Sequence, residues 1–140
     1  MDTETASLRS LDIELEERAD LLLESARELA ELRPEEREQL RERVLAFLRQ
    51  EIGAHITMDE RVLYPAVCER LGDPLVAAPL RYEHRAIRWW IDQIARADIT
   101  DVEELRRLLY GMHALLRVHL SREEELYADA LDSPGWPASG

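Results

Sequence analysis

Residues 34–72, PEEREQLRERVLAFLRQEIGAHITMDERVLYPAVCERLG, predict one long helix and decide the fold class. Pro34 is favoured at the first position of a helix, and two glutamates follow it in the first turn. Gly72 suits the left-handed residue that ends a helix, so the predicted helix spans residues 34–70. Pro65 lies inside it and predicts a kink. One face carries apolar residues at helical spacing: Leu40, Val44, Phe47, Leu48, Ile52 and Ile56.

Three further segments show the same periodicity, and glycine and proline fall mostly between them. The sequence Thr100-Asp101-Val102-Glu103 matches a capping box, which opens the last helix. Four long helices with short links predict an all-α fold, an up-down-up-down antiparallel four-helix bundle. We expect one domain over residues 1–132 and a C-terminal tail at residues 133–140. The other predicted helices span residues 7–32, residues 79–97, and residues from about 100 to just before Pro134.

Histidines and acidic residues fall on the apolar faces of these predicted helices. At 100° per residue, Asp59 lies about 40° from His55, among the leucines and isoleucines of its helix. His84 shares a face with the isoleucines of the third helix, within about 80° of them. His119 and Glu123 lie about 40° apart on the core face of the last helix. A helical-wheel projection of the sequence therefore predicts that three imidazoles and two carboxylates point into one core.

Inward carboxylates need a partner, because burying one in an apolar core is costly unless it is paired or bound to a metal. The chain has no lysine, and its 18 basic residues are all arginine. Imidazole with carboxylate is a ligand set for iron, manganese or zinc, and bundle cores commonly hold such sites. Residues 55–66, HITMDERVLYPA, also resemble residues 119–128, HLSREEELYA, which are one residue shorter before Leu-Tyr. Two matched motifs on alternate helices predict a cavity with room for two metal ions.

These motifs resemble those of the hemerythrin-like family, the HHE cation-binding domain. The family pattern is a histidine, an acidic pair four and five residues on, and then Leu-Tyr/Phe-Pro. It is matched by His55, Asp59-Glu60 and Leu63-Tyr64-Pro65; Glu83-His84 and His119 with Glu123-Glu124 match the later motifs. The resemblance implies a bundle around two non-haem irons, oxo- or hydroxo-bridged, with histidine ligands and bridging carboxylates. Family members bind dioxygen, sense oxygen or iron, or act on peroxide or nitric oxide.

The first helix departs from the family pattern, because it contains no histidine. Asp12 stands where that ligand is expected and is a candidate oxygen ligand. His113 is a further candidate, although it lies about 9 Å along the axis from His119. If His113 does not bind metal itself, it could orient a metal ligand through a hydrogen bond or line an access path to the site. The candidate metal ligands are His55, Asp59, His84, His119, Glu123, Asp12 and His113.

Other polar and aromatic residues near these motifs have plainer interpretations. We expect Glu60, Glu124 and Glu125 to be solvated or to support a ligand rather than to bind metal. Tyr64 lies about 180° from His55 on an ideal helix, which predicts packing beside Pro65, away from the ligands.

Charge and composition exclude several classes of function. The net charge of −12 disfavours nucleic acids and anionic membranes as partners. Residues 1–10 show no signal peptide, no segment is long and apolar enough to span a membrane, and Cys68 is the only cysteine. These features predict a cytoplasmic protein, monomeric or weakly homodimeric.

The favoured hypothesis is a di-iron protein that binds, senses or reacts with dioxygen, peroxide or nitric oxide. The carboxylate-rich ligand set favours the ferric state and so peroxide or nitric oxide chemistry, or sensing. One alternative is a bundle with a degenerate metal site that acts as a regulatory or interaction module. Another is a mononuclear iron or zinc site with a structural role, zinc being the less favoured metal.

Overall fold

The computed structural model describes residues 13–132, which form four helical rods. The first rod contains helical residues 13–18, helix α2 (Asp20–Glu28) and the 3₁₀ turn η1 (Leu29–Glu31). The expected start of this helix at residue 7 and the expected tail at residues 133–140 lie outside the described residues.

The second rod is one long helix that contains two π-helical turns. Pro34 occupies its first turn and Gly72, with a φ of 68°, ends it, as the sequence predicted. The kink expected at Pro65 stays a prediction, but a π turn at residues 59–63 closely precedes this proline. Pro65 itself lies in the first turn of α5, where its missing N–H costs little. The rod consists of α3 (Pro34–Phe47), η2 (Leu48–Ile52), α4 (Gly53–Met58), η3 (Asp59–Leu63) and α5 (Tyr64–Leu71).

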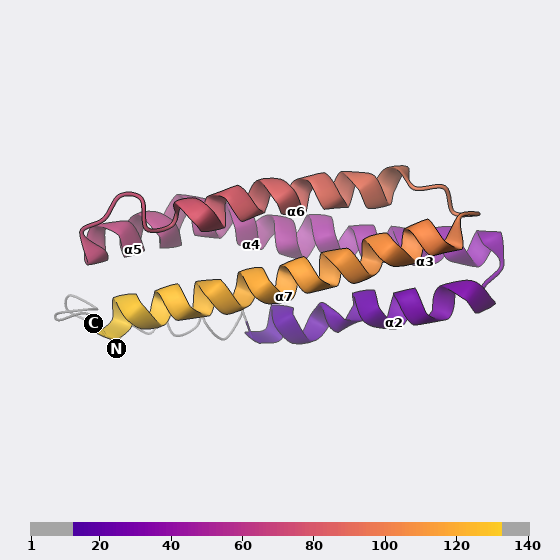
Figure 1. Cartoon of the computed structure of the whole chain (residues 1–140), viewed down its shortest axis with the longest axis horizontal. Coiled ribbons are helices and arrows are strands. Elements are labelled where there is room, and N and C mark those ends of the chain that lie inside the picture. Colours follow the sequence, from indigo (N-terminus) through magenta and orange to yellow (C-terminus); the bar gives the residue numbers. More distant parts are fainter. Residues whose placement is uncertain (1–12, 133–140) are drawn as a thin grey trace.

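Helices α6 (Ala78–Arg96) and α7 (Val102–Asp132) form the other two rods. Figure 1 shows that successive rods run in opposite directions, with α7 packed against both α2 and α6. The predicted all-α bundle is therefore confirmed, and the described residues contain no strand. None of the described helices is long and apolar enough to cross a membrane.

The start of α7 differs by one residue from the predicted capping box. The carboxylate of Asp101 accepts a hydrogen bond from the backbone N–H of Glu104 at 3.1 Å, so Asp101 is the cap. Thr100 is engaged elsewhere, because its N–H and hydroxyl donate to Asp98 Oδ1 at 2.9 and 2.7 Å. A threonine hydroxyl bound in the preceding turn cannot also cap the helix.

Two apolar clusters fill the bundle, and buried polar side chains lie at their junction. The larger cluster ends at Ile56 on the second rod and at Leu120 on α7. The smaller cluster begins at Leu63 and Leu126 on the same rods. Polar residues that fall between the two clusters, and are at most 1% exposed, are Asp59, His84, His119 and Glu123.

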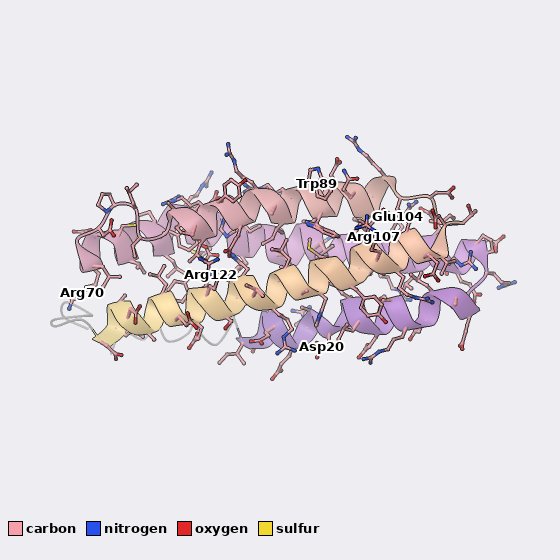
Figure 2. All side chains as sticks on the ribbon, viewed as in Figure 1. Asp20, Arg70, Trp89, Glu104, Arg107 and Arg122 are labelled. Atoms are coloured by element: carbon pink, nitrogen blue, oxygen red, sulfur yellow. The ribbon has the colours of Figure 1, made fainter. Side chains whose placement is uncertain are left out.

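Helices α6 and α7 approach closely at Gly111. A Cβ atom at this position would lie 2.4 Å from the ring of Trp90, so only glycine fits there without a rearrangement. Trp90 packs against the larger apolar cluster. Its neighbour Trp89 is 55% exposed on the outer side of α6 (Figure 2). This contact lies between the two helices that carry His84 and His119.

Candidate metal centre

The buried polar residues converge on one point between three rods. One nitrogen or oxygen atom from each of Asp59, His84, His119 and Glu123 lies within 4.8 Å of all the others. The Nε2 atoms of His84 and His119 are 3.1 Å apart. His55 joins them, with its Nε2 3.0 Å from Asp59 Oδ2 and 3.1 Å from Glu123 Oε1. We call these five residues the ligand layer.

Two glutamates outside the ligand layer orient its histidine rings. Glu60 lies 2.9 Å from Nδ1 of His84, and Glu83 lies 2.8 Å from Nδ1 of His119. A carboxylate at Nδ1 holds the proton there and turns Nε2 toward the centre, as in many metal sites. Glu83 is held in turn by an ion pair with Arg122, which extends from α7 toward α6 (Figure 2).

Tyr127 ties the two carboxylates of the layer together. Its hydroxyl lies 2.9 Å from Asp59 Oδ1 and 2.7 Å from Glu123 Oε2, and it donates its proton to this pair. Asp59 Oδ2 is buried and accepts no hydrogen bond within the described residues, although His55 Nε2 is near it. Proximity alone is insufficient, because the ring N–H must also point at the oxygen. An orphaned carboxylate oxygen facing imidazole nitrogens fits a bound cation.

Electrostatics in the layer also fit a cation. Burial is the largest influence on His55 and favours its neutral form, but the two carboxylates beside it, Asp59 and Glu123, together outweigh burial and raise its pKa to about 11. Burial similarly opposes charge on His119, yet Glu123 and Glu83 raise its pKa. Burial would raise the pKa of Glu123, but His119 and His55 hold it well below its ordinary value. Without metal, protons on His55 and His119 balance the carboxylates, and a metal ion would displace them.

The structure thus brings together five of the seven predicted ligands: His55, Asp59, His84, His119 and Glu123. His113 lies apart from them, with its Nε2 3.0 Å from Asp20 on α2. Its ligation of metal stays a prediction. Asp12 lies outside the described residues.

Tyr64 corrects the sequence analysis, which directed it away from the ligands. It is fully buried, and its hydroxyl lies 3.1 Å from Nε2 of His84. The helical wheel gave the wrong direction for Tyr64 because it assumes a regular α-helix, whereas the π turn η3 (Asp59–Leu63) lies between His55 and Tyr64. A π turn accommodates roughly one extra residue, which rotates the following side chains back by about 100°. The extra residue before Leu-Tyr in the first motif was the sequence signal for this rotation.

Three other residues near the centre were given no specific partner by the sequence. Tyr127 and Glu83 stood in the matched motifs without an assigned role, and Glu60 was one of several acids with an undecided role. The contacts of Glu83 with His119, of Glu60 with His84 and of Tyr127 with Asp59 cross between helices, so a wheel drawn for one helix cannot identify them.

Comparison with known proteins supports the same conclusion. Residues 12–131 match the family model of the hemerythrin HHE cation-binding domain, and this span includes every candidate ligand. No curated protein and no solved structure gives a significant match to the chain. The family match covers most of the sequence and agrees with the all-α bundle and its buried His/Asp/Glu cluster. The chain belongs to the hemerythrin HHE cation-binding domain family.

Proposed function

We propose that the ligand layer holds two non-haem irons and that the loaded protein binds, senses or reacts with dioxygen, peroxide or nitric oxide. The observation that carries this proposal is the convergence of three imidazoles and two carboxylates in a buried layer. Carboxylate oxygens and imidazole nitrogens together suit iron, and each carboxylate has two oxygens with which to bridge two ions. Asp12 and His113 are proposed as further ligands.

A bound iron pair would supply one-electron redox steps and open positions for a small ligand. The protein's own part is to orient and to exclude water. Glu60 and Glu83 hold the rings of His84 and His119 through Nδ1, and Tyr127 holds Asp59. The apolar clusters on both sides of the layer favour a ligand of a few atoms over a larger substrate.

Tyr64 places a hydroxyl within 3.1 Å of the inward nitrogen of His84. The other groups near that nitrogen are the ring of His119, at 3.1 Å, and the carboxylate of Asp59, at 3.6 Å. We propose that Tyr64 donates a hydrogen bond to a small ligand in the loaded site. Such a donor would favour ligands that carry partial negative charge.

A second candidate is a mononuclear centre with a structural role. The specific observation in its favour is that four ligand atoms gather within 4.8 Å of one another. Two imidazoles and two carboxylates around one point also suit a tetrahedral zinc ion. The first rod supplies no member of this cluster from its described residues.

Metal analysis after expression with added iron tests both candidates. Two irons per chain, with near-ultraviolet absorption from an oxo bridge, support the di-iron proposal. One zinc per chain, with helicity lost on chelation, supports the mononuclear candidate. No bound metal overturns both and leaves the interaction module.

A matched pair of variants ties the metal to the layer. Glu123→Gln removes a buried ligand, whereas Glu125→Gln makes the same charge change at an exposed site two residues away. We expect the first variant to lose most of its metal and the second to retain the wild-type content. Changes in the near-ultraviolet and visible spectrum of the reduced protein on adding dioxygen, peroxide or nitric oxide then identify the ligand.

A further inference from the structure

Helix α6 is basic in a strongly acidic chain. It carries four arginines and two acidic residues, whereas the whole chain has a net charge of −12. Three of these arginines, Arg81, Arg85 and Arg88, recur at spacings of four and three, which places them on one face of the helix.

These three arginines line a surface pocket of about 340 Å³ over α6. Its remaining lining residues are Glu60, Ala78 and Tyr82. Ala78 is the first residue of α6, so the positive end of a 19-residue helix also borders the pocket. We call this site the arginine pocket.

The positive charge of the arginine pocket is largely uncompensated. Arg88 lies 3.6 Å from Glu60, and this is the one ion pair among its lining residues. Arg81 and Arg85 form no ion pair with any part of the chain that the structure describes. Three guanidinium groups therefore share one carboxylate, an arrangement that a bound anion would stabilise.

Two contacts connect the arginine pocket to the ligand layer, and both end at His84. Glu60, the partner of Arg88, lies 2.9 Å from Nδ1 of His84. Arg81 stacks on the ring of Tyr64 with 5.4 Å between its Cζ and the ring centroid, and the Tyr64 hydroxyl reaches Nε2 of His84. Drawing either arginine toward an anion would alter the hydrogen bonding of this histidine.

We propose that the arginine pocket binds a small multivalent oxyanion, of the phosphate or polycarboxylate class, and that its occupancy is coupled to His84. Oxygens of the anion accept hydrogen bonds from Arg81, Arg85 and Arg88. The anion competes with Glu60 for Arg88, so Glu60 interacts more strongly with the Nδ1 proton of His84. A more strongly held proton there makes Nε2 a better electron donor. Anion binding itself stands independently of the proposed iron function, and only its effect on a bound metal rests on that function.

Calorimetric titration of the purified protein with inorganic phosphate, and separately with citrate, tests anion binding. Sodium chloride keeps the ionic strength constant, so that simple screening is the same in every titration. We expect saturable binding of one anion per chain. Tighter binding of phosphate than of citrate would identify an inorganic or phosphoryl ligand, and the reverse order a polycarboxylate. Absence of saturation with both probes overturns the proposal.

A matched pair of variants locates the anion. Arg85→Gln removes an unpaired guanidinium from the pocket, and we expect about ten-fold weaker binding from the loss of a charge-assisted hydrogen bond. Arg96→Gln removes the same charge from the far end of α6, where Arg96 pairs with Asp92, and we expect unchanged binding. Equal weakening by both variants would mean that the anion responds only to the overall charge.

The coupling between anion binding in the arginine pocket and His84 is tested separately. In protein that retains metal, we expect saturating phosphate to change the rate of metal release to a chelator at least two-fold, and Arg88→Gln to abolish this change. In protein purified without metal, the imidazole resonances of His84 should shift on adding phosphate, and less so in Arg88→Gln. Anion binding without either response refutes the coupling. Failure of metal loading alone leaves the titrations interpretable and counts only against the proposed function.

Discussion

Residues 55–64 on the second rod and residues 119–127 on α7 carry matching side chains on two different kinds of helix. Both begin with an inward histidine, continue with a buried carboxylate four residues later and end with a buried tyrosine. The tyrosine follows the histidine by nine residues in the first motif and by eight in the second. On α7, an uninterrupted helix, eight residues place Tyr127 about 80° from His119. On the second rod the π turn η3 absorbs the extra residue, so Tyr64 also reaches the layer.

This difference shows that the two helices tolerate change unequally. The second rod accommodates an extra residue between two aligned flanks, and removing that residue should restore an ordinary α-helix. Helix α7 has no such turn, so each of its buried positions depends on the regular spacing of the whole helix.

A pair of single-residue deletions tests this difference and has the largest expected effect. Deleting Glu125 rotates Tyr127 and the following apolar residues of α7 by about 100°, out of the core. We expect a loss of about 3 kcal/mol or more of unfolding free energy, because several buried side chains lose their packing. Deleting the exposed Arg61 from η3 should leave both flanks in register and cost much less. Denaturant unfolding compares them, and equal losses would contradict the assigned role of η3.

The two tyrosines supply a second test. Tyr127→Phe removes the donor shared by two buried carboxylates, at an expected cost of about 1–3 kcal/mol in the metal-free protein. Tyr64→Phe removes a single hydrogen bond to His84, at a cost of about 0.5–1.5 kcal/mol. Unfolding of both variants by denaturant measures the difference. A larger loss for Tyr64→Phe would mean that the hydroxyl of Tyr127 is not the main support of the carboxylates.

Two glycines extend the comparison beyond the motifs. Gly111→Ala on α7 introduces a Cβ atom into the ring of Trp90, and we expect a net loss of about 1–2 kcal/mol. Gly53→Ala on the second rod meets only Leu48 O, at 3.8 Å, and should gain about 0.5 kcal/mol from helix propensity. Thermal unfolding should therefore shift in opposite directions. Stabilisation by both alanines would show that Trp90 yields easily and that α6 and α7 are not tightly spaced.

Much of the fold and part of the centre could be predicted because they depend on local rules. Helix ends follow from residues such as Pro34 and Gly72, whose backbone preferences hold in any surroundings. Burial of His55, Asp59, His84, His119 and Glu123 follows from apolar periodicity, because a helix must direct its apolar face into the core. The cap at Asp101 was missed by one residue because Asp98 binds the hydroxyl of Thr100, which leaves Asp101 to cap the helix.

The sequence by itself determined the number and direction of the helices, and which side chains face inward. Only the tertiary structure decided which groups meet across the helices: Glu83 with His119, Tyr127 with Asp59, and His113 with Asp20. Such contacts depend on how whole helices are rotated and shifted along their axes relative to one another. The sequence pattern of one helix does not determine that placement. Tyr64 stands between these cases. Its extra residue is visible in the sequence, but packing decides whether a helix absorbs that residue as a π turn or turns its side chains away.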